Sequence, residues 1–223
     1  MAAPVGVAVI PVMIVPILTR PELLDRMLDS VDYEVETLIV IDNGHCLPGD
    51  FAPRPWAQNA YLLRMPSNLG VATSWNLGIK ATPFAPWWLV ANFDVTWPAG
   101  SLEQFDTEDA PEVIRLAHAT PPWCAFSIGE DVVRRVGLFD EYLHPAYFED
   151  NDYERRCEAA GMPVVQSGIP VTHHNSSSLD GPYRAANERT FVANAQYHEA
   201  KQYRGDLSEG HWSLKRRRAQ SWD

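Results

Sequence analysis

The sequence predicts an α/β protein with an open mixed sheet, mostly parallel and flanked by helices, and with a C-terminal helical extension. Three observations support this prediction. Apolar runs of strand length are aliphatic at consecutive positions, which is typical of strands buried on both faces of a parallel sheet. Helical patterns separate these runs. Clusters of Asp, Asn and His follow the runs directly, where open α/β sheets bind their ligands.

In the first half of the chain, the patterns predict the order β-α-β-β-α-β. The four strands are apolar runs, and the second ends in the turn-forming residues 42–44. The first helix is expected because Thr19 and Glu22 have capping-box spacing and the first helical turn tolerates Pro21. The second helix begins at Asn68. The strands are expected over residues 5–15, 37–41, 61–64 and 87–91, and the helices over 19–31 and 68–80.

The second half is less regular. A helix ending at Ala160 is expected because Asp150 or Asp152 can cap it and Gly161 can stop it. A polar tail is expected from Gly205 onward. Strands are expected over residues 112–117, 125–128, 164–165 and 171–172, and further helices over 130–136 and 182–203.

The chain of 223 residues has the length of one domain with an appendage. We expect a domain over residues 1–180, divided near residue 95, and a segment over 181–223 with the last helix and a basic tail. The apolar start, residues 1–18, lacks a basic region and is interrupted by prolines. We therefore expect a buried strand there, and no transmembrane segment.

The charge balance limits the possible partners. The chain has 18 Lys and Arg residues against 29 Asp and Glu residues, a net charge of −11. This argues against a protein whose whole surface binds nucleic acid or an anionic membrane. A local exception is the basic run Lys215, Arg216, Arg217 and Arg218. It is either a solvated tail or a docking site for a polyanion such as DNA, a lipid headgroup or an acidic protein.

The cysteines indicate the compartment. Cys46, Cys124 and Cys157 are widely spaced and odd in number, which fits neither a disulfide framework nor a zinc site. This use of cysteine indicates that the protein resides in a reducing compartment. We expect a cytoplasmic protein, soluble or peripheral to a membrane.

Polar side chains follow three of the predicted strands. Asp42 and Asn43 follow the second, Asn92 and Asp94 follow the fourth, and a histidine pair at 173–174 follows the last. A nucleoside diphosphate carries adjacent negative charges, which a divalent cation can bridge. Carboxylate oxygens, sometimes with an imidazole, hold such a cation. The sequence therefore predicts a site for a metal ion and a nucleotide.

These residues belong to motifs that stand in the order of a known family. The chain resembles the family 2 glycosyltransferases of the GT-A fold, of the rhamnosyltransferase-like kind, over about residues 5–178. The motifs lie at residues 16–20 (PILTR), 40–44 (VIDNG), 68–78 (NLGVATSWNLG), 92–94 (NFD), 136–141 (VGLFDE), 147–152 (YFEDND) and 173–174 (HH).

The resemblance implies transfer of a sugar from a UDP, dTDP or GDP donor to an acceptor hydroxyl, with inversion and with Mn²⁺ or Mg²⁺ as cofactor. It assigns the nucleotide-sugar to the half over about residues 1–95 and the acceptor to the half over about 96–180. The acceptor is left open among a polysaccharide, a lipid-linked glycan, a protein and a modified DNA base. The implied nucleotide-sugar-binding residues are Pro16, Thr19, Arg20, Asp42, Asn43, Asn68, Gly70, Asn76 and Asn92.

The resemblance also implies the chemical roles. Asp94 and His173 would hold the metal ion, and Asp150 would be the base that takes the proton of the acceptor hydroxyl. Glu149, Asp152 and Trp123 would support the acceptor, although packing is the simpler role for Trp123. Asn92 stands where the family has the first Asp of its Asp-x-Asp motif. The change removes one negative charge, which weakens metal binding.

Each motif taken alone has a simpler interpretation. Residues 42–44 could be only a turn, Asn68 only a helix cap, and the acidic run 149–152 only a favourable helix start. The histidine pair could be a core or surface pair. Seven motifs in family order favour the functional interpretation.

Two other classes of protein remain as alternatives. One is a catalytically degenerate protein that binds a nucleotide or glycan without turnover, which Asn92 favours. The other is a nucleotidyltransferase of related fold. Such enzymes hold a triphosphate with a loop that contains Gly and Lys, and residues 16–21 contain neither.

Overall fold

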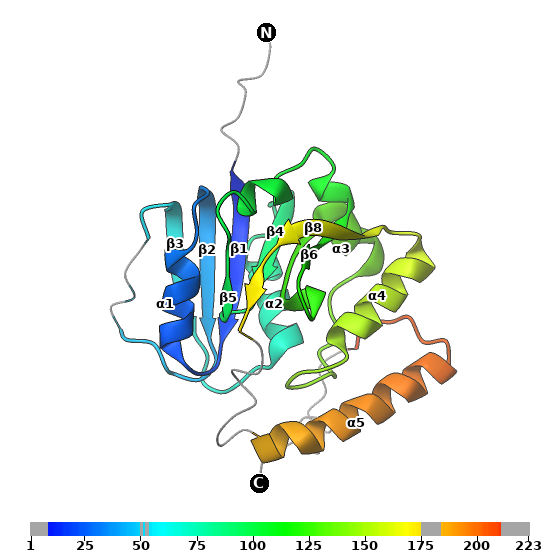
Figure 1. Cartoon of the computed structure of the whole chain (residues 1–223). Coiled ribbons are helices and arrows are strands. Elements are labelled where there is room, and N and C mark those ends of the chain that lie inside the picture. Colours follow the sequence, from blue (N-terminus) through cyan, green and yellow to red (C-terminus); the bar gives the residue numbers. More distant parts are fainter. Residues whose placement is uncertain (1–8, 50, 52–53, 175–183, 211–223) are drawn as a thin grey trace.

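The computed structural model describes residues 9–49, 51, 54–174 and 184–210 (Figure 1). The strand β1 (Ile10–Ile17) lies inside the main sheet and pairs in parallel with β2 (Val35–Asp42) on one side and β4 (Trp87–Ala91) on the other. β3 (Ala57–Arg64) continues the parallel sheet beyond β2. β1, β2 and β4 form because most of their residues are apolar on both faces, and both faces are covered. β3, at the edge, is more polar and only partly buried.

The rest of the main sheet is mixed. β7 (Ala125–Gly129) is antiparallel to β4 and to β6 (Ile114–His118), while β8 (Val164–Pro170) pairs in parallel with β6 at the edge. The seven strands have the order β3-β2-β1-β4-β7-β6-β8, which confirms the predicted mixed, mostly parallel sheet. Two short strands, β5 (Val95–Thr96) and β9 (Thr172–His173), form a separate antiparallel pair.

Helices cover both faces of the sheet. α1 (Pro21–Asp29) packs into the apolar core on one face. α2 (Val71–Ala81), α3 (Glu130–Val136) and α4 (Glu149–Ala160) pack into the core on the other face. α5 (Arg184–Tyr203) lies below α4 in Figure 1, next to the loop that precedes α4. The described part of the chain also contains three single-turn 3-10 helices: η1 (Leu102–Phe105), η2 (Ala110–Glu112) and η3 (Pro122–Cys124).

Several predicted boundaries were wrong. The first strand extends to Ile17, and of its expected start only residue 9 onward is described. β2, β3 and β8 are longer than predicted because neighbouring strands pair with their polar ends. β6 begins at Ile114, because Glu112 belongs to η2. The short β5 was not predicted. α3 and β4 have the predicted bounds.

The two predicted helix caps were also wrong. α1 follows Arg20, which has a left-handed backbone with φ of 59°, and no side chain caps the helix. The Thr19 hydroxyl is buried and makes no hydrogen bond. α4 likewise follows a left-handed residue, Phe148, so Asp150 and Asp152 lie in its first turn and not at the cap position. In both cases the chain enters the helix from a left-handed residue, which a side-chain capping box does not allow.

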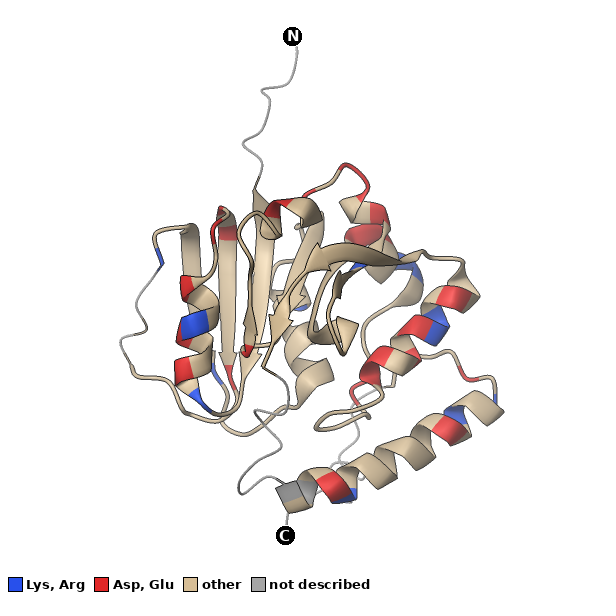
Figure 2. Ribbon diagram, viewed as in Figure 1, with Lys and Arg blue, Asp and Glu red and all other residues tan. Residues whose placement is uncertain are grey.

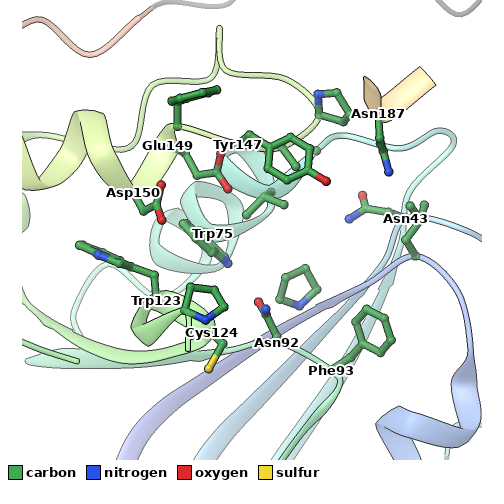
Figure 3. A pocket seen from close by; sticks show the side chains of 18 of the residues that line it. Asn43, Trp75, Asn92, Phe93, Trp123, Cys124, Tyr147, Glu149, Asp150 and Asn187 are labelled. Carbon is green, nitrogen blue, oxygen red and sulfur yellow. The ribbon is translucent and has the colours of Figure 1, made fainter. Parts of the chain in front are cut away.

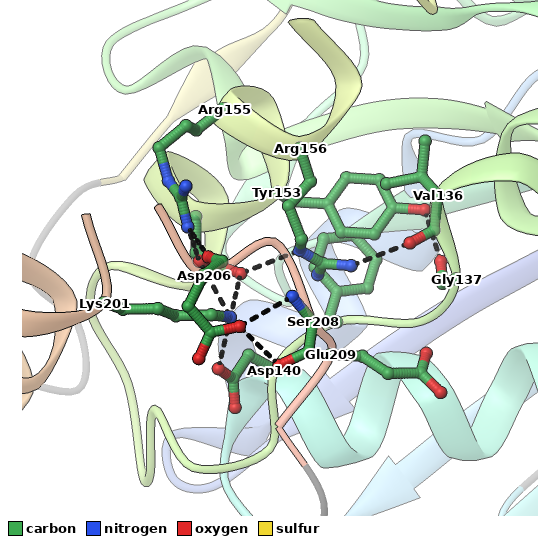
Figure 4. A network of polar contacts seen from close by, with 12 residues as sticks. Val136, Gly137, Asp140, Tyr153, Arg155, Arg156, Lys201, Asp206, Ser208 and Glu209 are labelled. Atoms are coloured by element: carbon green, nitrogen blue, oxygen red, sulfur yellow. Dashed lines mark hydrogen bonds and ion pairs between the residues drawn. The ribbon is translucent and has the colours of Figure 1, made fainter. Parts of the chain in front are cut away.

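A buried ionic network joins α5 to the rest of the fold (Figure 4). The side chain of Lys201 has no exposed area, and its Nζ lies 2.7 Å from Asp140 Oδ2 and 3.0 Å from the Asp152 carboxylate. Arg156 Nε donates to Asp152 at 2.9 Å, and the Tyr197 hydroxyl donates to Asp140 at 2.9 Å. The network connects α5, α4 and the segment after α3.

Beyond α5, the described chain continues to Gly210. The Asp206 carbonyl accepts a hydrogen bond from Arg155 Nη2 at 2.5 Å, and the Glu209 carboxylate accepts one from the Leu138 N–H at 2.5 Å. The basic run 215–218 lies outside the described residues, and docking through it stays a prediction, as does a domain boundary at residue 180. In the part of the chain that is described, no helix has the length and apolarity to cross a membrane.

Candidate active site

A cavity of about 440 Å³ opens where β1 and β4 end (Figure 3). The chain runs from β1 outward to β2 and β3 and then returns to β4 on the other side of β1. The connections at the carboxyl ends of β1 and β4 therefore leave in opposite directions, which creates a crevice for a ligand. Pro16 from β1 and Asn92 and Asp94 after β4 line this crevice.

One wall of the cavity carries Asp94 and His173. The pairing of β5 with β9 sets Val95 opposite His173 and so brings the two motifs together. Asp94 Oδ1 lies 3.2 Å from His173 Nε2, and Asn92 Nδ2 lies 3.5 Å from the same nitrogen. Burial disfavours the charged imidazole of His173, but the hydrogen bond and charge of Asp94 outweigh burial and raise its pKa. The neighbouring His174 contacts Asp94 through its backbone N–H, which donates to the Asp94 carbonyl oxygen.

This wall suits a divalent cation that is coordinated partly by the protein and partly by a second molecule. Among the described residues, no group of three or more His, Cys, Asp and Glu side chains could hold a metal ion by itself. Asp94 and His173 offer one carboxylate and one imidazole in contact with each other. A cation held by these two residues would have open coordination positions, which phosphate oxygens and water could fill.

The opposite wall carries Glu149 and Asp150, which lie in the first turn of α4 and point into the cavity in Figure 3. The two residues before them, Tyr147 and Phe148, have left-handed backbones with φ of 80° and 73°. Such strain in consecutive residues with side chains is typical of functional loops. Burial raises the pKa of the Asp150 carboxyl, although the N–H of Asn151, 2.8 Å from Asp150 Oδ1, opposes this. A carboxylate with a raised pKa is a stronger base.

Aromatic side chains line the cavity between these walls. Trp75 and Trp123 both pack edge-on against Phe126, with ring centres 5.1 and 4.8 Å apart respectively. Asn187 and Phe191 of α5 also line the cavity, and sequence reasoning missed both. Phe191 packs against Tyr147, whose ring centre lies 5.2 Å away. In the sequence, the aromatic residues Tyr147 and Phe148 before the acidic run 149–152 indicated this wall. Nothing in the sequence pattern of α5 indicated that it lines the cavity.

The structure brings most of the predicted site residues to this cavity. They are Pro16, Asn43, Asn68, Gly70, Asn92, Asp94, Trp123, Glu149, Asp150 and His173. The Asn43 side chain bridges two segments: its Nδ2 donates to the Ser74 hydroxyl at 2.9 Å, and its Oδ1 accepts from the Leu69 N–H at 3.1 Å.

Asp42 is not among the residues that line the cavity. Its side chain is fully buried, and its carboxylate accepts hydrogen bonds from the backbone N–H groups of Gly44, Cys46 and Leu47, each at 3.1 Å. It therefore holds the loop after β2 in place. The predicted contact with the base or ribose has no support in this placement.

Four further predicted residues lie elsewhere. Thr19 does not line the cavity, and Arg20 is exposed and pairs with Glu22 at 3.2 Å. Asn76 exchanges two hydrogen bonds of 2.9 Å with the backbone of Phe139, which fastens α2 to the segment after α3. Asp152 belongs to the buried ionic network. Asn76 and Asp152 therefore stabilise the elements that form the cavity without lining it.

Gly70 lines the cavity and also has a structural role, while its predicted approach to the ligand stays a prediction. Its φ is 82°, and a Cβ atom there would lie 2.7 Å from the Pro145 carbonyl oxygen and 2.8 Å from His144 Cδ2. The next residue, Val71, donates its N–H to the same Pro145 oxygen at 2.7 Å. Gly70 thus lets the loop before α4 pack against the start of α2, which shapes the cavity.

Substituting Gly70 tests this packing. We expect Gly70→Ala to lower the free energy of unfolding by about 2–4 kcal/mol, since it adds a clash to the cost of a left-handed residue. Gly100 is a matched control, because its φ is 73° but nothing lies within 4 Å of a Cβ atom there. Gly100→Ala should lower the free energy of unfolding by only about 1–2 kcal/mol. Urea titration of both variants and the wild-type protein measures these losses. Equal losses for the two variants would contradict the packing argument.

The cysteines have no partner cysteine and are free thiols. Cys124 lines the cavity, where burial and then the charge of Asp94 raise its pKa to about 12. It therefore stays a neutral thiol at physiological pH, as expected for an inert apolar side chain.

Comparisons with known proteins identify the fold. No protein-family model and no curated protein matches the chain in sequence. S. aureus TarS 1-349 matches in structure with a TM-score of 0.60 at 13% identity, over 86% of this chain and 65% of that chain. GalNAc-T7 with UDP, GalNAc and Mn²⁺ matches with a TM-score of 0.59 at 10% identity, over 95% of this chain and 54% of that chain. The chain thus spans less than two thirds of the length of these solved chains.

A third structure, S. aureus TarS 1-349 in complex with UDP, matches with a TM-score of 0.51 at 13% identity, over 73% of this chain and 59% of that chain. At these identities the likeness shows the fold. The chain has an open α/β fold with a crevice at the carboxyl ends of parallel strands. Within that class it has the GT-A fold of glycosyltransferases, as the motifs predicted.

Proposed function

We propose that the protein is a glycosyltransferase that moves a sugar from a nucleoside-diphosphate donor to an acceptor hydroxyl with inversion. One observation carries the proposal. A single cavity of the GT-A fold has a carboxylate and an imidazole, Asp94 and His173, on one wall, and two acidic side chains, Glu149 and Asp150, on the other. The first pair suits a cation and a diphosphate, and the second suits proton transfer.

The reaction assigns a role to each wall. Asp150 accepts the proton of the acceptor hydroxyl as that oxygen forms a bond with the anomeric carbon. The bond from that carbon to the phosphate oxygen breaks, and the nucleoside diphosphate leaves with the electron pair. Attack from the side opposite the leaving group inverts the anomeric configuration. Asp94 and His173, which line the same cavity as the base, would contact the diphosphate.

A divalent cation is part of the proposal. Asp94 and His173 would hold it, and it would neutralise the negative charge that develops on the leaving diphosphate. Mn²⁺ suits a carboxylate and an imidazole together better than Mg²⁺ does, because Mg²⁺ prefers oxygen ligands. The Mn²⁺ in the GalNAc-T7 structure supports this choice.

The structures of the same fold and the sequence resemblance suggest candidates for the donor. UDP is the first candidate for the base, because UDP is present in solved structures of the same fold. Rhamnose is a candidate sugar because of the sequence resemblance. The free thiols support a reducing compartment, and we propose the cytoplasm.

The two alternatives have less support. A nucleotidyltransferase would hold a triphosphate after β1, where residues 16–21 contain no Gly or Lys. A binding protein without turnover would need no base, yet Asp150 lies in the cavity with a raised pKa. Release of pyrophosphate would indicate the first alternative, and ligand binding without turnover the second.

The proposed metal and nucleotide site predicts a metal-dependent stabilisation. With UDP, dTDP, GDP and CMP tested with and without Mn²⁺, one nucleotide should raise the melting temperature only when Mn²⁺ is present. A ligand at a hundred times its dissociation constant adds about 2.7 kcal/mol to the stability of the folded state. Asp94→Ala should abolish this increase, because it removes the carboxylate ligand.

Asp25→Ala is the matched control, because Asp25 lies on the exposed side of α1 and is absent from the cavity. It should bind the nucleotide as the wild-type protein does. A folded wild-type protein that responds to none of the four nucleotides would refute the proposed donor site. A metal-dependent increase that persists in Asp94→Ala would remove Asp94 from the metal site.

A further inference from the structure

The side chain of Glu149 is unusual among the residues of the cavity. It lines the cavity, yet it is only 7% exposed. Its Oε2 atom is buried and makes no hydrogen bond to the protein. In Figure 3 the carboxyl group points into the cavity, between Tyr147 and Asp150. A buried polar atom without a partner is costly in a native protein, so a ligand that supplies the partner would stabilise the site.

The protonation state of this group decides what Oε2 can offer. Burial, and then the negative charge of Asp150, raise the pKa of Glu149 to about 8. At neutral pH, Glu149 is therefore mostly a neutral acid, which can donate a hydrogen bond as well as accept one. The titratable groups around it are Tyr147 and Asp150, then His198 of α5, which acts on Asp150, and Asp94 and His173, which line the same cavity.

The burial of the two acidic side chains indicates which substrate each one meets. Asp150 is the more accessible of the two, and the acceptor reaches the base from solvent. Glu149 is the more buried one, so it faces the part of the cavity that the enclosed donor fills. The donor sugar lies between the diphosphate side, at Asp94, and the base. Its ring carries hydroxyl groups that can accept a hydrogen bond.

We propose that Glu149 is a specificity residue for the donor sugar, whose neutral carboxyl group donates a hydrogen bond from Oε2 to a sugar hydroxyl. This inference rests on the proposed function and deepens it. It separates the roles of the two neighbouring acids: Asp150 takes a proton from the acceptor, and Glu149 keeps its own proton and recognises the donor.

The test compares each nucleotide-sugar with its own nucleoside diphosphate. The probes are UDP-glucose, UDP-N-acetylglucosamine, dTDP-rhamnose and GDP-mannose, measured by calorimetry with Mn²⁺ at pH 7. Glu149→Ala should weaken binding of the preferred nucleotide-sugar about tenfold and leave the nucleoside diphosphate unchanged. Glu149→Gln should keep affinity within about threefold, because the amide has nearly the same shape and its N–H can donate. Glu158→Gln, on an exposed turn of α4, is the control and should change nothing.

The outcomes separate this inference from the proposed function. If the wild-type protein binds no nucleotide and no nucleotide-sugar, the proposed function fails, and this inference fails with it. If nucleotides bind but Glu149→Ala binds the preferred nucleotide-sugar as tightly as the wild-type protein, the inference alone is overturned. It is also overturned if Glu149→Gln loses as much affinity as Glu149→Ala, since the group would then accept and not donate.

A pH series provides a second readout. The affinity of the wild-type protein for the nucleotide-sugar, relative to the nucleoside diphosphate, should fall as the pH rises through about 8 and Glu149 ionises. Glu149→Gln should show no such fall. If the relative affinity falls equally in both proteins, another group titrates, and the proposal that Glu149 is protonated is overturned.

Discussion

Asp150→Asn is expected to lower turnover by about a hundredfold to ten-thousandfold while nucleotide binding stays unchanged. The amide has almost the shape of the carboxyl group but cannot take up a proton. Asp150 lies at the exposed side of the acidic wall, and the helix position that carries it is held by Asp152 in the buried network. The substitution therefore removes the base and leaves the cavity in place.

Turnover can be measured before the acceptor is known, as release of the nucleoside diphosphate when the sugar is transferred to water. The wild-type rate should decrease as the pH falls through the raised pKa of Asp150, because only the ionised form is a base. Asp131→Asn is the control, since Asp131 lies on α3 outside the cavity. A rate for Asp150→Asn above half of the wild-type rate would assign the proton transfer to another group.

The sequence predicts the sheet well because its strands are simple. Most residues of β1, β2 and β4 are apolar on both faces, and this pattern has few interpretations besides a buried parallel strand. Short elements carry no such pattern. β5 has two residues, and its pairing with β9 depends on contacts across some 80 residues of chain. Propensity and periodicity cannot reveal such pairs.

The site was predictable as a set of strand ends, but the direction of each side chain was not. Asp42 is the last residue of β2 and Asp94 follows β4, yet Asp94 lines the cavity and Asp42 turns back to accept hydrogen bonds from three backbone N–H groups of its own loop. Asp150 and Asp152 lie two residues apart on one helix, so they point to different sides, and only Asp150 reaches the cavity. A motif names the residue type at a position, whereas the packing around it decides its partner.

The last wall of the cavity could not be predicted, because α5 comes from a separate part of the sequence. Asn194 of α5 donates hydrogen bonds to the carbonyl oxygens of His144 and Ala146, at 3.2 and 2.8 Å, in the loop before α4. The same helix supplies Asn187 and Phe191 to the cavity. The C-terminal helix, predicted as an extension, is part of the candidate site.

Lys201→Met is expected to lower the free energy of unfolding by about 3–5 kcal/mol, the largest effect on stability that the structure predicts. Methionine has a similar length but no charge. The substitution leaves Asp140 and Asp152 fully buried, and Asp140 keeps hydrogen bonds from the Tyr197 hydroxyl and the Tyr142 N–H but loses its cationic partner. Lys80→Met is the matched control, because Lys80 is exposed and lies 3.5 Å from Glu141. It should change stability by less than about 0.5 kcal/mol in the same urea titration.

A double variant separates the lost ion pair from lost packing. Lys201→Met with Asp140→Asn leaves one acid of the network, Asp152, which still pairs with Arg156 at 2.9 Å. The double variant should therefore be more stable than Lys201→Met alone, since it removes the uncompensated buried charge. If it is less stable, packing of the lysine stem and not its charge holds α5 in place. Because α5 completes the cavity, Lys201→Met should also weaken nucleotide-sugar binding, although Lys201 does not line the cavity. The buried network would then be the link between the stability of the C-terminal helix and the shape of the site.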